Sequence, residues 1–182
     1  ISYSSNSYEE SIINNTSSSV KSVLDTWYKN SLVKYTSYLA DEIFCNDRSI
    51  ASGSGYLLST RTYYSSYDRL VNKKSPTLSC VNNNDKFNLL NIDAKLDYPV
   101  ALITADEVAM AGGVYNMANT NYYLYNGQYF WTLSPSRYLY HNSSAYVWYL
   151  SNSGSIFSWD QVFTNISIRP VINLRADVQI TK

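Results

Sequence analysis

Apolar residues first recur at helical spacing after a polar lead-in. Residues 1–18 are mostly Ser, Asn and Thr, and we expect them to form a flexible segment. From Val20 to Tyr28 the apolar positions lie three or four residues apart, and the serines before them can cap a helix. This pattern predicts an amphipathic helix over residues 19–30 and a second helical stretch near residues 32–39.

The middle of the chain alternates short apolar runs with long polar stretches. Residues 43–45 have the pattern of a short buried strand, and the apolar run at residues 98–103 predicts a central strand. Between these runs, residues 49–97 show little periodicity and are interrupted by Gly, Pro and a run of Asn. A loop tract of this length is uncommon in a domain unless it is tied down or functional.

A strong helix-start signal follows the predicted central strand. Thr104 with Glu107 three residues later forms a capping box, and the glycine pair at 112–113 marks the end of a helix over residues 105–111. The neighbouring Asp106 and Glu107 could suggest acid–base catalysis. Carboxylates in a first helical turn also stabilise the helix dipole, and we interpret this pair as structural.

The C-terminal half has the residue types of short strands. Asn-Gly at 126–127, between two aromatic runs, predicts a hairpin that joins residues 122–125 to residues 129–133. Further predicted elements are two strands and a turn, at residues 146–150, 168–174 and 153–154. Helices come first and mainly antiparallel strands follow, which indicates an α+β fold.

Composition limits the partners of this chain. Its 182 residues correspond to about one domain, which we assign to residues 19–182. Lys and Arg number 14 and so do Asp and Glu, which argues against nucleic acid or an acidic membrane surface as a partner. No apolar run approaches the roughly 18 residues of a membrane span, so we expect no membrane insertion of this segment. Hydrophobic content of 45% predicts a folded chain, and 19 tyrosines replace the usual charged residues.

The two cysteines have two interpretations. Cys45 and Cys80 form either one disulfide or two buried thiols, and their spacing fits no C-x-x-C metal or redox motif. We expect the disulfide, because the chain is rich in Tyr, Asn and Ser and poor in Lys, which would place it in an oxidising compartment. Such a bridge would tie down the long loop tract.

Conventional catalytic and cofactor motifs are scarce. His141 is the single histidine and has no nearby cluster of Cys, Asp or Glu that could complete a zinc site. No serine lies in a G-x-S-x-G elbow, and Gly53 and Gly55 lack the rest of a phosphate loop. The run at residues 83–85 lacks the spacing of a calcium-binding EF-hand. We therefore expect a protein that is not an enzyme and that has no cofactor or metal site.

The tract between Glu107 and Asp160 has an unusual composition. Arg137 is its only formally charged residue, and nine tyrosines and three tryptophans are set among Asn, Ser and Gly. Tyr and Trp provide large contact areas at low entropic cost, and the small polar residues provide adaptable hydrogen bonds. We expect about half of these rings, Trp131 especially, to fill the core and the others to form a recognition surface.

Several sequence blocks resemble a known family. Trp131-Thr-Leu-Ser-Pro-Ser136 and Ile168-Arg-Pro-Val-Ile-Asn-Leu174 resemble W-x-x-S-P and G-V-R-P-V-I-N-L blocks of bacterial surface domains with a C-type-lectin-like fold. Residues 44–48 and 98–107 resemble further blocks of such proteins from gut Firmicutes, some of which begin with a prepilin-type leader. The resemblance covers most of residues 20–174. It implies N-terminal helices and short antiparallel strands with long loops.

The chain also departs from the relatives of this family. Ser167 and Ile168 stand where the family usually has Gly and Val. The paired active-site cysteines of the related formylglycine-generating enzymes have no match near the C-terminus. The glutamate-proline-asparagine and tryptophan-asparagine-aspartate motifs of calcium-dependent sugar lectins are absent. The missing cysteines argue against formylglycine-generating activity, and the missing motifs argue against calcium-dependent sugar binding.

Other relatives are variable proteins diversified by retroelements, and these imply a binding face. Their variable positions lie on one exposed face in the C-terminal part of the fold and arise at Asn codons, which mutate readily to Tyr, Ser, Asp or His. Residues 138–159 are rich in such residues. By position, the resemblance implies ligand binding by Tyr138, Tyr140, His141, Asn142, Tyr146, Trp148, Ser151, Asn152, Phe157 and Trp159.

Strand alternation predicts which rings of this tract are exposed. It sends Val147 and Tyr149 to one face and Tyr146 and Trp148 to the other. Because Val147 is the more natural core residue, we predict that Tyr146 and Trp148 are exposed, with Trp148 in the core and Tyr149 outside as the alternative. Arg169, next to a proline and an apolar strand, is predicted to be structural and to pair with a carboxylate or a backbone carbonyl.

These observations predict a non-catalytic, extracellular or cell-surface binding domain. It would be adhesin-like or pilin-borne and would present a Tyr/Trp/Ser/Asn-rich face to a protein or a glycan, with diversification by a retroelement implied by the resemblance. The alternative is a structural subunit of a surface appendage, whose aromatic residues would be buried against neighbouring subunits.

Overall fold

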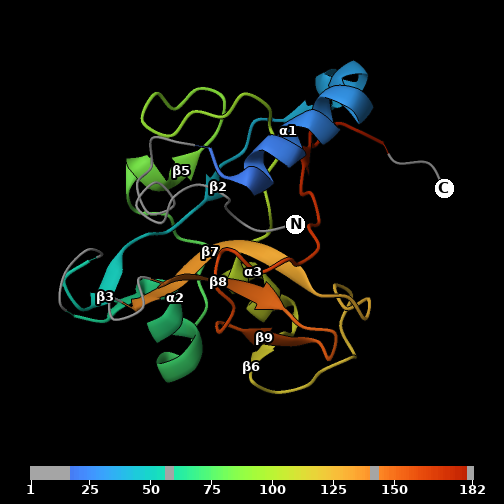
Figure 1. The fold of residues 1–182 in the computed structure, drawn as a ribbon. Coiled ribbons are helices and arrows are strands. Elements are labelled where there is room, and N and C mark those ends of the chain that lie inside the picture. The colour runs from blue at the N-terminus through green and yellow to red at the C-terminus, as the bar shows by residue number, and fades with distance from the viewer. Residues whose placement is uncertain (1–16, 56–59, 140–143, 180–182) are drawn as a thin grey trace.

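The computed structural model describes residues 17–55, 60–139 and 144–179, and the fold is α+β (Figure 1). Its centre is a curled sheet of six strands, all antiparallel except for the parallel pair β6–β9. In spatial order the strands are β3 (Ile50–Ser52), β4 (Thr62–Tyr64), β7 (Phe130–Leu139), β8 (Ser144–Leu150), β9 (Ser155–Phe157) and β6 (Val114–Tyr115).

Helices and two small ladders surround the sheet. The helical elements are α1 (Ser19–Ser31), the 3₁₀ helix η1 (Val33–Tyr38), α2 (Ser65–Tyr67), the π-helical η2 (Asp68–Lys73), the 3₁₀ turn η3 (Asn83–Asp85) and α3 (Ala105–Ala111). The ladders pair β1 (Leu39–Ala40) with β10 (Asn173–Leu174), and β2 (Phe44–Cys45) with β5 (Lys86–Phe87). Figure 1 shows α1 and α2 on opposite sides of the central strands β7 and β8.

The two principal helices have the boundaries and caps that the sequence predicts. The Ser18 side chain accepts a hydrogen bond from the Lys21 amide at the start of α1, whose apolar stripe is buried. Thr104 and Glu107 form the predicted capping box of α3, and Gly112, with φ of 124°, ends it. The second predicted helical stretch is the short 3₁₀ helix η1.

Strand β8 is buried on both faces, so the prediction that Tyr146 and Trp148 are exposed is wrong. Val147 and Tyr149 pack with α1 in one core cluster, as alternation predicts, but Trp148 is 0% exposed and packs with α3 and η2 in a second cluster. Tyr146 is also buried. The alternative is confirmed for Trp148, which lies in the core, and wrong for Tyr149, which is buried and not outside. The reason is that elements distant in sequence cover each face of the sheet.

Two predicted strand regions lack regular pairing. Residues 98–103 are mostly buried, but only Ala101 pairs, through a bridge with Val171; the predicted strand at 168–174 is reduced to that bridge and β10. No hairpin forms at Asn126-Gly127: residues 122–125 form a turn, because the Tyr122 and Tyr125 hydroxyls donate to carbonyls of the β8–β9 turn instead.

The predicted turn at residues 153–154 is present and fixed by close packing. The Gly154 amide donates to the Ser151 carbonyl, and Gly154 has φ of 79°. A Cβ at this position would lie 1.7 Å from the Asn119 carbonyl oxygen. The turn therefore requires glycine both for its backbone conformation and for the approach of the 119–125 segment.

Cys45 and Cys80 form the predicted disulfide, and the alternative of two buried thiols is excluded. The bridge joins Cα atoms that are 5.8 Å apart and 35 residues apart in sequence. The tract that it closes contains short elements as well as loops, namely β3, β4, α2 and η2. The disulfide ties this tract to β2.

Arg169 has one of the two partners that the sequence predicts. Its Nη1 donates to the Leu124 carbonyl at 2.7 Å, and its guanidinium carbon lies 4.2 Å from the centroid of the Phe130 ring. Burial lowers the pKa of this guanidinium below its usual value. The side chain links the turn at residues 122–125 to the edge of the core.

Replacing Arg169 with Ala should lower the free energy of unfolding by about 1–2 kcal/mol, because a charged hydrogen bond to a carbonyl is lost. Urea denaturation at neutral pH measures this change. The conservative variant Arg169→Lys keeps the charge and part of the stem packing, and it should lose less. An unchanged stability of Arg169→Ala would contradict the structural role.

Candidate functional site

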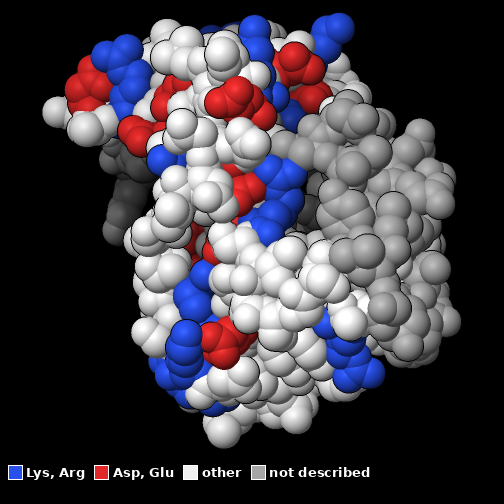
Figure 2. Space-filling view, turned by 90° about the vertical axis from the view of Figure 1, so that its left-hand side faces the viewer, with Lys and Arg blue, Asp and Glu red and all other residues white. Residues whose placement is uncertain are grey.

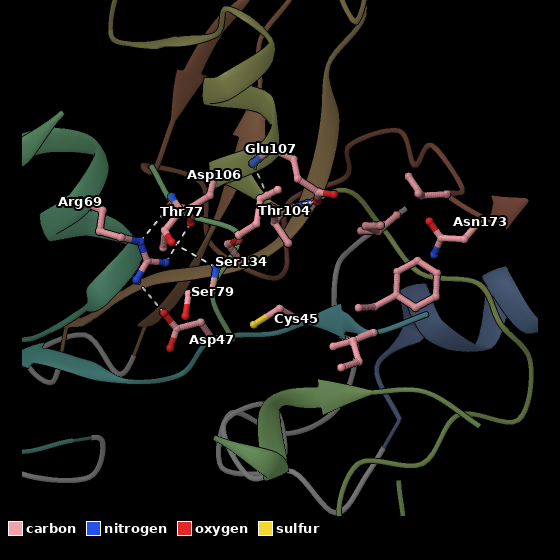
Figure 3. Close-up of a pocket in the computed structure, with 15 residues that line it drawn as sticks. Cys45, Asp47, Arg69, Thr77, Ser79, Thr104, Asp106, Glu107, Ser134 and Asn173 are labelled. Atoms are coloured by element: carbon pink, nitrogen blue, oxygen red, sulfur yellow. Dashed lines mark hydrogen bonds and ion pairs between the residues drawn. The ribbon is translucent and has the colours of Figure 1, made fainter. Parts of the chain in front are cut away.

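A cavity of about 210 Å³ lies between β2, α3 and η2, and its lining includes the charged residues Asp47, Arg69, Asp106 and Glu107 (Figure 3). Arg69 of η2 donates from Nε and Nη2 to the two carboxylate oxygens of Asp106, at 2.9 and 2.8 Å. Its Nη1 donates to Asp47 at 2.7 Å. Asp106 also accepts a hydrogen bond from the Thr77 amide. Arg69 therefore holds together three segments of the chain.

The charged states of this triad are mutually stabilised. Burial alone would lower the pKa of Arg69, but its ion pairs with Asp106 and Asp47 raise that pKa above its usual value. Burial alone would raise the pKa of Asp47, and hydrogen bonds from Ser49 and Arg69 outweigh it, so that the Asp47 pKa is lowered. Stability from Asp47 is thus present above the usual carboxyl pKa and is lost as pH falls through the lowered one.

The other carboxylate of the cavity is also engaged. Glu107 accepts hydrogen bonds from the amide and the hydroxyl of Thr104, each at 2.8 Å. The interpretation of Asp106 and Glu107 as structural residues agrees with these contacts, although the partner of Asp106 is an arginine that the sequence did not indicate. We assign the polar lining of this cavity to fold stabilisation.

A second site lies on the sheet, where aromatic rings surround an arginine. We call it the Arg137 cluster, and it comprises Arg137, Tyr146, Trp159, Tyr115 and Tyr67. The guanidinium carbon of Arg137 lies 3.8 Å from the centroid of the Trp159 ring and 4.7 Å from that of Tyr146. Tyr146 is the cross-strand partner of Arg137 in the β7–β8 ladder.

Four elements supply the rings of the Arg137 cluster. Trp159 follows β9 and donates from its indole nitrogen to the Tyr115 hydroxyl of β6 at 3.3 Å. The Tyr115 ring lies edge-on to Tyr67 of α2, at 6.3 Å, and to Trp148, at 5.7 Å. Trp148 in turn donates to Ser66 beneath them. The cluster thus packs on the buried Trp148 and ends at Trp159, which is 58% exposed.

Two cations and a tyrosine with a raised pKa lie in or beside the Arg137 cluster. Burial, followed by the neighbouring Tyr115, raises the pKa of Tyr67, although Arg137 acts in the opposite direction. Lys74 lies 5.8 Å from the Tyr115 ring, and Arg61 donates to the hydroxyl of Tyr63, whose ring contacts that of Tyr67. The Tyr67 hydroxyl can therefore act as a hydrogen-bond donor at neutral pH.

The ten predicted binding residues do not form one exposed face. Tyr138, Tyr146, Trp148 and Ser151 are buried, Phe157 is half-buried and stacks on Tyr149, and Asn152 and Trp159 are exposed. Ser151 and Asn152 lie in the β8–β9 turn, at the end of β8 opposite Tyr146. Tyr140, His141 and Asn142 lie outside the described residues. A role in ligand contact remains a prediction for all ten.

The structure brings Tyr146, Trp148 and Trp159 together with two residues outside the ten predicted ones. Tyr115 of β6 belongs to the Tyr-rich tract between Glu107 and Asp160, whereas Tyr67 of α2 lies outside that tract and was not indicated by the sequence. Arg137 carries a signal in the sequence, because it is the one formal charge between Glu107 and Asp160. That isolation could have identified it as the centre of the site.

The charge distribution and the comparisons give no further identification. Figure 2 shows basic and acidic side chains interspersed on the face that carries β3, α2 and β5, and ion pairs such as Arg48–Asp85 and Lys73–Asp68 neutralise part of this charge.

Within the residues that the structure describes, no helix is long and apolar enough to cross a membrane, and no group of three or more His, Cys, Asp or Glu side chains could hold a metal ion. No protein-family model, curated protein or solved structure matches this chain.

Proposed function

We propose that this chain is a non-catalytic, extracellular or cell-surface domain with a C-type-lectin-like fold that binds a protein or glycan ligand at the Arg137 cluster. The observation that carries the proposal is the placement of Trp159, whose indole is 58% exposed although it stacks on the buried Arg137 guanidinium. A large aromatic ring that remains in solvent beside a buried charge is typical of a binding hot spot. The disulfide supports an oxidising, extracellular location.

The chemistry of the Arg137 cluster supports binding better than catalysis. Its functional groups are phenol hydroxyls, an indole N–H and a guanidinium. The hydroxyls, the indole N–H and the guanidinium can all donate hydrogen bonds, and a guanidinium is a very weak acid, so these groups suit binding by hydrogen bonds. The resemblance to retroelement-diversified surface proteins also supports a variable face near the C-terminus. Among the described residues of that predicted face, Asn152 and Trp159 are exposed, and the proposal places the ligand at Trp159.

A glycan and protein array with the purified domain tests this proposal. A ligand found on the array should lose at least tenfold in affinity for Trp159→Ala, since hot-spot rings contribute about 2 kcal/mol or more. Tyr123→Ala is the matched control, because Tyr123 is 82% exposed and belongs to no part of the cluster. This control should bind as the wild type does.

Two results would contradict the proposal. One is a ligand that binds Trp159→Ala and the wild type equally. The other is an array without ligands, together with a domain that oligomerises in size-exclusion chromatography and becomes monomeric on Trp159→Ala. That outcome would favour the structural subunit of an appendage.

A further inference from the structure

We propose that the Arg137 cluster is a receptor for a carboxylate carried by a sugar, so that the ligand is an acidic glycan. This inference rests on the proposed function and specifies its ligand class. It starts from an unsatisfied group: Nε and Nη2 of Arg137 are buried and have no hydrogen-bond partner, and the residue is 3% exposed. Buried polar groups in proteins are nearly always hydrogen-bonded, and an unpaired pair of guanidinium N–H groups indicates a missing partner.

The two unpaired atoms form a specific receptor. Nε–H and the adjacent N–H of Nη2 are parallel, and their spacing matches the two oxygens of one carboxylate. The same chain shows this edge in use, because Nε and Nη2 of Arg69 donate to the two oxygens of Asp106 at 2.9 and 2.8 Å. No described side chain plays the part of Asp106 for Arg137. Arg69 thus shows the fork engaged by a carboxylate, and Arg137 has the same pair of donor atoms, buried and without a partner.

The surrounding charges favour an anion as the partner of Nε and Nη2 of Arg137. Arg61 and Lys74 approach the rings of the cluster, through Tyr63 and Tyr115 respectively. The carboxylate nearest to Arg137 in sequence, Asp160, interacts with the Tyr149 hydroxyl. Burial is the largest cause of the raised pKa of Tyr149, and Asp160 is the next largest. Asp160 therefore belongs to the other side of the strand. An incoming carboxylate meets positive charge and hydrogen-bond donors.

The aromatic groups favour a sugar as the carrier of the carboxylate. In uronic and sialic acids the carboxyl group is attached directly to the ring, so a carboxylate held by the fork places the ring beside Trp159, which lies 3.8 Å from the guanidinium carbon. The apolar C–H face of a sugar ring can pack on the exposed indole, and its hydroxyls can bond to Tyr115 and Tyr146. An Asp or Glu side chain would fill the fork but leave the indole uncovered.

Isothermal titration calorimetry with defined probes tests the inference. The acidic probes are trigalacturonic acid and sialyllactose, and their neutral partners are trigalactose and lactose. At least one acidic probe should bind at least tenfold more tightly than its neutral partner. Arg137→Lys should lose at least tenfold of that affinity, because a lysine cannot form the fork. Trp159 fluorescence should change on binding to the wild type.

Controls separate this inference from the proposed function. Arg169→Lys makes the same chemical change at an arginine outside the cluster and should leave affinity within twofold. If Arg137→Lys does not fold, the comparison of acidic with neutral probes on the wild-type protein still decides the matter. Failure of both acidic probes, equal binding of the neutral partners, or exclusive binding of a hexaglutamate peptide would each overturn the inference. A neutral ligand that depends on Trp159 would overturn the acidic ligand class and leave the proposed function intact.

Discussion

Replacing Asp106 with Asn is expected to lower the free energy of unfolding by about 3 kcal/mol, because it removes the buried carboxylate that binds Arg69 through two hydrogen bonds and leaves this guanidinium with Asp47 alone. Asp106 forms both hydrogen bonds of the Arg69 fork and accepts a third from the Thr77 amide. An asparagine retains the shape of the side chain but can accept through only one oxygen and carries no charge. Asp47 would remain as the sole ionic partner of Arg69 among the residues described.

Urea denaturation of Asp106→Asn and of Asp177→Asn gives a matched comparison. Asp177 forms the same kind of forked pair, with Arg175, but both side chains are more than half exposed. Exposed pairs contribute at most about 1 kcal/mol, so the control should be close to the wild type. Equal losses for the two variants would show that burial does not strengthen the Asp106 pair. A loss below about 1 kcal/mol for Asp106→Asn would contradict the role assigned to the triad.

Removing the disulfide is expected to have a similarly large effect. The double variant Cys45→Ser, Cys80→Ser should unfold with a free energy lowered by about 3–4 kcal/mol, because the bridge restricts the unfolded chain over a 35-residue separation. Within this tract, Arg48 forms an ion pair with Asp85 of η3. Leu78, close to Cys80, is exposed and contributes little to the core.

Two measurements check the disulfide prediction. Thiol titration of the denatured, unreduced protein should detect no reactive thiol, and two thiols would show that the bridge does not form. Guanidinium denaturation of the wild type with and without reductant should give the same difference in stability as the double variant. If reductant destabilises the wild type and the double variant alike, the effect does not arise from this bond.

The elements with local signals could be predicted from the sequence. The boundaries of α1 and α3 follow from Ser18 and from the pair Thr104 and Glu107, which cap residues three positions away. The two cysteines allow a single pairing, so the disulfide had only one alternative, two free thiols. In each case the physical cause lies within a few residues, or the number of alternatives is very small.

Features that depend on distant partners could not be predicted. Residues 98–103 are mostly buried, but in regular pairing they form only the bridge between Ala101 and Val171. Tyr122 bonds to Gly154, which no short-range pattern indicates, and so the Asn-Gly hairpin does not form. Trp148 is covered because α3 and η2 pack on its face of the sheet. The Arg137 cluster is likewise assembled from β7, β6 and α2.

The burial of β8 on both faces has a consequence for the use of this domain as a scaffold for selected binders. Each side chain of β8 is enclosed by one core cluster or its surroundings, so randomising the strand would yield libraries dominated by unfolded members. Exposed positions such as Tyr123 and Trp159 lie outside it, on segments that the buried strand supports. Libraries restricted to such positions would keep the frame intact while changing the surface that a selection samples.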